Sequence, residues 1–258
     1  MKKNELEEEG QSVKYILPFY FAIKVKITCR ILQMQSFLLL QIHGMIDTTR
    51  RFEFGGRHMK YIVIDMEWNR PEQKSRLVRK PIILHGEIIQ IGAVMLSEEL
   101  DEIDSFEVKI SPKFYMKMNR KVEELTGITN KVLKEGQPFP EAINRFKDWC
   151  GKDSVLLTWG PCDVEMLEDN LIAHEMDYSW IPEEFDAQVM FDFQETMEDK
   201  NYSLDYAMYY FHLKGIKAHD ALNDARDTAA VIRKLNLNEF IHEERAWRRK
   251  CEEVKAVS

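Results

Sequence analysis

The sequence predicts an α/β fold with a mixed central sheet of about five strands and helices on its faces. Three strand-like segments come first, at residues 61–64, 87–96 and 103–110. The first is a short, mainly β-branched run, and the third alternates apolar side chains on one face. Helical and strand-like segments then alternate along the chain, an order that favours helices packed on a sheet.

The remaining elements follow from turn residues, caps and apolar spacing. Residues 69–85 have the composition of a loop, and residues 155–158 form a further apolar strand. Ser203 precedes an apolar-periodic stretch and predicts a capped helix that ends near Gly215. Helical spacing favours core positions over a base-stacking surface for most of the aromatic residues Trp180, Tyr202, Tyr206, Tyr209 and Tyr210. Further helices are predicted at residues 121–125, 140–150, 164–174, 222–235 and 239–253.

The composition fits one ordinary domain with extensions. The chain has 258 residues, of which 45% are apolar, enough to bury a substantial core. Its 36 basic and 44 acidic residues give a net charge of -8, so the surface as a whole repels a polyanion. Any nucleic-acid partner must therefore meet a local basic patch.

Residues 1–58 differ from the rest of the chain, because apolar and basic residues alternate there without a helical or strand period. We expect an extension of doubtful structure, with the native start near Met59, since the purine-rich codons of Gly55-Gly56 would resemble a ribosome-binding site read in frame. A basic extension that contacts substrate and a small subdomain are the alternatives. Residues 59–237 then form the main domain, and 238–258 form a charged C-terminal helix.

The sequence predicts neither a membrane span nor a disulfide framework. An apolar run at residues 15–23 is shorter than the roughly 18 to 20 residues that a spanning helix requires. The cysteines form no CxxC pair; they are Cys29, Cys150, Cys162 and Cys251. We therefore expect a protein of the reducing cytoplasm that has no membrane partner.

Asp65 and Glu67 stand two residues apart at the end of the first predicted strand, so their side chains project from the same face. Carboxylates this close repel each other, and the pKa of one rises unless a cation lies between them. Their oxygens suit a hard divalent ion such as Mg²⁺ or Mn²⁺. Taken alone, the pair is explained more simply as two solvated acids at a strand end.

Asp163 follows the strand at residues 155–158 and a Trp159-Gly160-Pro161 turn, and it opens the next helix. Alone, it is explained by stabilisation of a helix N-terminus, worth about 0.3 to 1 kcal/mol. In a sheet whose neighbouring strands run parallel, however, this position lies near the edge where Asp65 and Glu67 emerge.

His219 and Asp224 flank the start of the helix predicted at residues 222–235. Asp224 lies beside the buried apolar stripe of this helix, where a carboxylate needs a partner, and a metal fits better than an exposed salt bridge. An aspartate favoured by the helix dipole is an equal alternative. His219 alone is explained as a surface histidine.

Together these segments resemble the DEDDh branch of the DnaQ-like exonucleases. The resemblance covers residues 61 to about 235. It rests on Asp65-Met66-Glu67, residues 87–93, Leu125-Thr126-Gly127-Ile128-Thr129, residues 159–163 and residues 215–225. It implies an RNase H-like sheet, with residues 59–237 as the exonuclease domain.

The resemblance also implies a two-metal site. Two Mg²⁺ or Mn²⁺ ions per active site would be held by Asp65, Glu67, Asp163 and Asp224, with His219 as the base that deprotonates the attacking water. Two such ions about 3.5 to 4 Å apart activate water and stabilise the leaving 3'-oxygen. The product would be a nucleoside 5'-monophosphate from a 3' end, formed without a covalent intermediate.

Several residues are candidates for binding the substrate. Trp159-Gly160 before Asp163 is similar to the Eri-type and KapD-type exoribonucleases, which indicates RNA. Where many family members have a small hydroxyl residue after the glutamate, this chain has Trp68 and Asn69. Trp68 can stack on a base, which is worth roughly 1 to 3 kcal/mol, or it can pack beneath the site; the two alternatives are equal here.

A basic segment follows the first predicted strand and is the best candidate for binding phosphates. It contains five basic residues against the single acid Glu72: Arg70, Lys74, Arg76, Arg79 and Lys80. An ordinary solvated loop is the alternative.

We therefore expect a metal-dependent 3'-to-5' exonuclease that acts on single-stranded RNA ends. Its rivals are a DNA exonuclease, an exonuclease for short oligonucleotides, and a nucleic-acid-binding protein that keeps the fold without the activity. All five site positions are filled, which argues against the last. The oligomeric state is left open by the sequence.

Overall fold

The computed structural model describes residues 59–198 and 200–257. The expectations for residues 1–58, including the start near Met59, lie outside the described residues. The sheet and the helices α2 to α8 belong to one compact unit, Glu53–Glu244, whereas Arg245–Ser258 belong to a second unit. Within the described residues, no helix is both long enough and apolar enough to cross a membrane.

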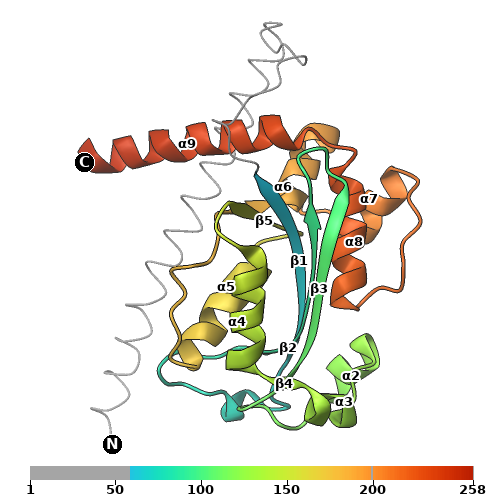
Figure 1. The fold of residues 1–258 in the computed structure, drawn as a ribbon, viewed down its shortest axis with the longest axis vertical. Coiled ribbons are helices and arrows are strands. Elements are labelled where there is room, and N and C mark those ends of the chain that lie inside the picture. Colours follow the sequence, from blue (N-terminus) through green and yellow to red (C-terminus); the bar gives the residue numbers. More distant parts are fainter. Residues whose placement is uncertain (1–58, 199, 258) are drawn as a thin grey trace, which may run out of the picture. The chain divides into compact units, whose positions relative to one another are not determined.

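The centre of the fold is a six-stranded mixed sheet with the order β4-β3-β2-β1-β5-β6 (Figure 1). The strands are β1 (Lys60–Asn69), β2 (Glu87–Leu96), β3 (Glu102–Ser111), β4 (Gln137–Pro138), β5 (Ser154–Thr158) and β6 (Glu184–Asp186). The predicted α/β sandwich and its first strands are confirmed. The sequence did not predict β4 and β6, because strands of two and three residues are too short to show an alternation.

The pairing of β1 decides where the polar strand ends meet. β1 runs antiparallel to β2, with Asp65 opposite Gly92, and parallel to β5, with Val63 opposite Leu157. β5 in turn runs parallel to β6. The carboxyl ends of these three parallel strands therefore lie at the same edge of the sheet.

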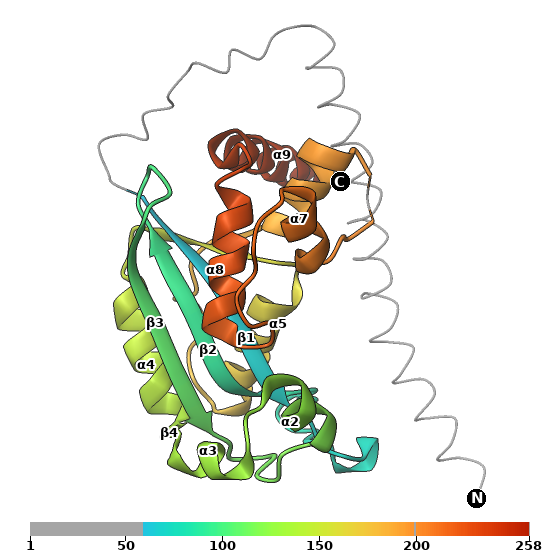
Figure 2. The same cartoon turned by 90° about the vertical axis from the view of Figure 1, so that its right-hand side faces the viewer.

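Helices of the same unit cover both faces of the sheet (Figures 1 and 2). Their bounds are α2 (Arg120–Thr126), α3 (Asn130–Glu135), α4 (Phe139–Cys150), α5 (Cys162–Ala173), α6 (Ala187–Phe191), α7 (Leu204–Tyr210) and α8 (Ala221–Ile232), and α9 (Leu237–Val257) is the last helix of the chain. Lys74–Arg76 form a 3₁₀ turn, and Asp192–Thr196 form a π-helical turn after α6. The short helices α3 and α6 were not predicted, and α7 ends at Tyr210, well before Gly215.

β1 lies between two apolar cores, one on each of its faces. Ile62 and Ile64 belong to the core beneath α4 and α5, whereas Val63 belongs to the core beneath α6, α7 and α8. Because successive side chains of a strand point to opposite faces, Asp65 and Glu67 lie on the α8 side. The fold thus directs both carboxylates toward the start of α8.

The start of α8 packs directly on β2. A Cβ atom added to Gly92 would lie 2.0 Å from the backbone nitrogen of Leu222 and 2.2 Å from the carbonyl carbon of Ala221. The residues that α8 buries include the small side chains of Ala221, Ala225 and Ala229, which permit a close approach. Only a residue without a side chain fits opposite Asp65, and this contact brings the first turn of α8 to the site.

A buried glutamate and a tyrosine hold the loops at the carboxyl end of β1. The Glu87 carboxylate accepts hydrogen bonds from the backbone N–H groups of Lys113 (2.5 Å), Phe114 (3.0 Å) and Tyr115 (2.6 Å). The Tyr115 hydroxyl donates to the Leu84 carbonyl (2.6 Å) and accepts from the Val78 N–H (3.1 Å). Residues 78–84, which include the last two basic residues of the basic segment, Arg79 and Lys80, are thereby fixed to the sheet.

The prediction that most of the tyrosines near α7 are core residues is wrong. Tyr206, Tyr209 and Tyr210 are 39%, 76% and 40% exposed. Helical spacing alone did not distinguish the buried face of this short helix, whose buried residues are Ala207 and Met208.

We expect Gly92→Ala to displace α8 and to lower the free energy of unfolding by roughly 1 to 3 kcal/mol or more, because the added methyl group meets backbone atoms that cannot rotate away. Denaturant unfolding measures this cost. Gly151→Ala is the control, since its methyl group would meet no atom within 4 Å and any loss there reflects only the left-handed backbone, with a φ angle of 70°. Equal losses in the two variants would contradict a close backbone contact at Gly92.

Candidate active site

Asp163 is tied to the end of β1. It is the second residue of α5 and is only 5% exposed, and its Oδ1 accepts a hydrogen bond of 3.0 Å from the backbone N–H of Met66. Met66 lies between Asp65 and Glu67 in the strand. The first turn of α5 therefore adds a buried carboxylate to the strand end that carries the other two.

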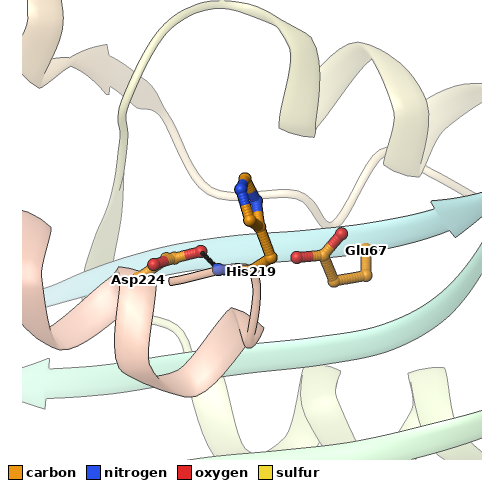
Figure 3. Close-up of side chains that lie close together, drawn as sticks. All are labelled: Glu67, His219 and Asp224. Carbon is orange, nitrogen blue, oxygen red and sulfur yellow. Dashed lines mark hydrogen bonds between the residues drawn. The ribbon is translucent and has the colours of Figure 1, made fainter. Parts of the chain in front are cut away.

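Glu67, His219 and Asp224 come together from β1, the loop before α8 and the first turn of α8 (Figure 3). A carboxylate oxygen of each acid and a ring nitrogen of His219 all lie within 4.8 Å of one another. The backbone N–H of His219 also donates to Asp224 Oδ2 at 2.8 Å. His219 has a φ angle of 60°, a left-handed conformation that is uncommon for residues other than glycine.

The carboxylates at the end of β1 resist ionisation. Burial raises the pKa of Asp65 well above its ordinary value, and the charges of Asp163, Asp224 and Glu67 raise it further. Burial also raises the pKa of Glu67 to about 7, with added repulsion from Asp224 and Asp220. The repulsion arises only between carboxylates that lie close together, which is the arrangement expected from the sequence for Asp65 and Glu67.

The two acids from the helices show the same behaviour. Burial raises the pKa of Asp163 to about 8 against the opposing hydrogen bond from Met66, and Glu184 and Glu67 add repulsion. Burial raises the pKa of Asp224, although the N–H of His219 opposes this shift. Sequence reasoning missed Glu184 and Asp220 as contributors, because their positions depend on the short strand β6 and on the N-cap of α8.

The donor set fits a hard divalent cation. Each carboxylate is an oxygen ligand of the kind that Mg²⁺ and Mn²⁺ prefer, and a cation placed among them would turn their mutual repulsion into attraction. Partly buried anions without such a partner are costly. The site therefore has both the ligands and the electrostatic need for a divalent metal ion.

Trp68 and Arg70 line a pocket of about 500 Å³ at the start of α5. Its other lining residues are Pro71, Leu77, His85, Cys162, Glu165, Met166 and Asp169. Trp68 is partly buried and packs against the core beneath α4 and α5. The indole of Trp68 packs against the core and also lines the pocket, so packing and stacking on a base do not exclude each other.

Asn69 does not face a substrate. It is fully buried, and its Nδ2 donates to the carbonyls of Tyr115 (2.7 Å) and Lys117 (3.0 Å), while its Oδ1 accepts from the N–H of Asn119 (2.9 Å). The prediction of a substrate contact is therefore corrected, and Asn69 instead joins β1 to the segment before α2. No pattern of residue types indicates this role, because every bonded partner is a backbone group.

Trp159 is also held within the protein. Its Nε1 donates to the carbonyl of Tyr202 at 3.1 Å, and its ring centroid lies 6.0 Å from that of Phe191. It is partly buried against the core on the α8 side. These contacts give Trp159 a packing role at the turn that precedes Asp163.

The basic segment is exposed. Arg70, Arg76, Arg79 and Lys80 are all on the surface, and the side chain of Lys74 lies outside the described ones. Arg70 alone of these lines the pocket beside Trp68. The fixation of residues 78–84 by Tyr115 keeps Arg79 and Lys80 at the carboxyl end of β1.

The loop before α8 meets the end of α2, a contact between two segments on which the family resemblance rests. The ammonium of Lys217 lies 3.7 Å from the position of a Cβ on Gly127, the residue that ends α2 with a φ angle of 75°. Leu125 and Ile216 are each 53% exposed. The glycine within the Leu125–Thr129 motif was the available signal, since a left-handed glycine marks a tight turn.

The chain is similar in sequence to a known protein and similar in fold to solved structures. It is 25% identical over 118 residues to the probable 3'-5' exonuclease KapD of Bacillus subtilis, and the match covers 45% of this chain and 55% of KapD. The chain thus spans about half the length of this relative. The structure of the nuclease domain of 3'hExo, a DEDDh family member bound to rAMP, matches with a TM-score of 0.60 and 19% identity over 69% of this chain and 92% of that one.

An E. coli ExoI–ssDNA complex shares the fold as well, with a TM-score of 0.54, 16% identity, and coverage of 69% of this chain and 40% of that one. At these identities the solved structures establish the fold alone. The family model described as Exonuclease (RNase_T) matches residues 62–232, which is well over half of the chain. The chain therefore belongs to the RNase_T exonuclease family.

Proposed function

We propose that the protein is a metal-dependent 3'-to-5' exonuclease that releases nucleoside 5'-monophosphates from single-stranded RNA ends. The observation that carries this proposal is the convergence of Glu67, His219 and Asp224 within 4.8 Å, next to Asp65 and Asp163. Membership of the exonuclease family supports the same reaction class.

Asp65, Glu67, Asp163 and Asp224 would hold two Mg²⁺ or Mn²⁺ ions. When bound, such ions supply Lewis-acid activation of water and neutralise charge at the scissile phosphate. The raised pKa values of these carboxylates support the assignment, because burial and neighbouring acids together make their ionised forms costly without a cation.

His219 would accept the proton of the attacking water. Its side chain is exposed and can return that proton to solvent, and its ring lies beside Glu67 and Asp224. Imidazole is suited to this role near neutral pH. The hydrogen bond from its backbone N–H to Asp224 fixes the base relative to a residue that would hold a metal ion.

The substrate would lie across the carboxyl end of β1. Trp68 borders the pocket there and offers a face on which a base stacks, while Arg70 in the same pocket offers a charge to a phosphate. Arg76, Arg79 and Lys80 would contact phosphates farther along the strand. This local basic segment offsets the net charge of -8 of the whole chain.

Single-stranded RNA is the proposed substrate, and DNA is the alternative. The Trp159-Gly160 sequence before Asp163 supports RNA, as does the similarity in fold to 3'hExo, which has been solved bound to rAMP. The similarity to ExoI bound to ssDNA favours the alternative. We assign residues 59–237 as the catalytic domain and propose the cytoplasm as its location, because the buried Cys150 and the exposed Cys162 are free thiols.

The proposed function is tested by digestion of matched 3'-labelled and 5'-labelled RNA and DNA oligomers with and without Mg²⁺. We expect 5'-monophosphates from the 3' end, faster on RNA, and loss of hydrolysis with EDTA. Asp224→Ala should abolish hydrolysis and leave the fold intact, whereas Asp148→Ala, on the exposed side of α4, should keep full activity. Full activity of Asp224→Ala, or shortening from the 5' end, would reject the proposal.

The basic segment should control the salt dependence of binding. We expect the triple variant Arg76→Ala, Arg79→Ala, Lys80→Ala to bind single-stranded RNA more weakly. The plot of log K against log salt should become less steep by up to about 2, because each lost phosphate contact on a single strand contributes about 0.7 to its slope. Fluorescence anisotropy over a salt series measures this slope.

The control for this variant removes the same number of charges from the other end of β1 and from the end of α8. Lys60, Lys152 and Lys234 are exposed at those places, and replacing them by alanine should leave the slope nearly unchanged. An identical slope in both triple variants would show that the basic segment is an ordinary solvated loop.

A further inference from the structure

The loop that carries His219 has no helix or strand of its own. It connects α7 to α8 (Figure 2), and its non-glycine residues His212 and His219 have left-handed φ angles of 54° and 60°. Most of its side chains are exposed. A loop with these properties needs fixed points if it is to hold a catalytic side chain in one place.

Those fixed points are side chains of α8. Asp227 accepts the backbone N–H of Ile216 through Oδ2 at 3.2 Å and Oδ1 at 3.4 Å. Asn223 donates to the carbonyl of Lys217 at 3.2 Å, and Asp224 accepts the N–H of His219 at 2.8 Å. Within the described part of the chain, these are the hydrogen bonds that the backbone of residues 215–219 makes to α8.

Asp227 is the most buried of the three. It is 8% exposed, and a Cβ added to Gly215 would lie 3.0 Å from its Oδ2, so the loop backbone packs directly on the carboxylate. A buried carboxylate is costly unless its oxygens are hydrogen-bonded, and here the donor is a loop amide rather than a basic side chain. Asp227 lies three residues after Asp224, and side chains at this spacing are neighbours on one face of a helix, so the same face of α8 makes both contacts.

We propose that Asp227 is a positioning residue for His219, which fixes the loop at Ile216 and thereby sets the place of the imidazole beside Glu67 and Asp224. The inference rests on the proposed function, because it gives a role to a residue that acts through the proposed base. Asp227 touches neither the substrate nor a metal ion in this scheme; its effect passes through the loop backbone.

A double-mutant cycle between Asp227→Ala and His219→Ala tests the inference. We expect Asp227→Ala to lower kcat by roughly 10- to 100-fold with little change in KM, because small displacements of a catalytic group cost rates of this order. In the His219→Ala background, the same substitution should lower kcat no further, since the residue that it positions is already absent. Equal losses in both backgrounds would overturn the proposal.

Two further variants separate positioning from stability. Val231→Ala removes fully buried atoms one turn farther along α8, and we expect it to lower the melting temperature without the loss of kcat. Asp227→Asn keeps an oxygen that can accept the Ile216 N–H, and we expect most of the activity to return. A loss of kcat in Val231→Ala equal to that in Asp227→Ala would assign Asp227 a merely structural role and overturn the proposal.

Hydrogen exchange of the amides of residues 215–219 supplies a readout that does not depend on activity. Asp227→Ala should accelerate exchange there, and Val231→Ala should not. If His219→Ala hydrolyses RNA at the native rate, the proposed base is wrong and the positioning role falls with it, even if exchange shows that Asp227 holds the loop. If His219→Ala is strongly slowed and Asp227→Ala is unchanged in both rate and exchange, only the positioning role is wrong.

Discussion

The contact between the first turn of α8 and Gly92 is the constraint on which the site depends. Backbone atoms of Ala221 and Leu222 occupy the space that any side chain at position 92 would fill. Since Gly92 lies opposite Asp65 in the sheet, this contact brings Asp224 and the loop with His219 to the end of β1. A helix held farther away by an ordinary side chain would separate the acids of the helix from those of the strand.

The acids gathered in this way destabilise one another, and that conflict explains the chemistry of the site. Burial and mutual repulsion raise the pKa values of Asp65, Glu67, Asp163 and Asp224 together. Folding therefore brings together carboxylates whose ionised forms bound cations would stabilise. The surrounding loops are correspondingly well fastened, by Glu87 and Tyr115 on one side and by α8 on the other, because a site with strong internal repulsion must be held by contacts outside it.

The sequence predicted the parts of the site whose signals are local. Asp65 and Glu67 follow from alternation in one strand, and the resemblance to a family added Asp163, His219 and Asp224, which local patterns alone explain otherwise. Asn69 and Asp227 escaped because their partners are backbone groups of distant segments, which leave no pattern in residue types. The strands β4 and β6 escaped because pairing with their neighbours, not their own composition, makes them strands.

Thermal unfolding of the native protein and of Asp65→Asn, each with EDTA and with Mn²⁺, tests the central electrostatic claim most directly. The pKa of Asp65 is raised on folding, so this carboxyl costs stability increasingly as the pH rises above its unfolded pKa, and the cost is complete only above the folded pKa. The account predicts that Asp65→Asn melts higher than the native protein in EDTA and gains less from Mn²⁺. A lower melting temperature in EDTA together with an undiminished gain from Mn²⁺ would contradict it.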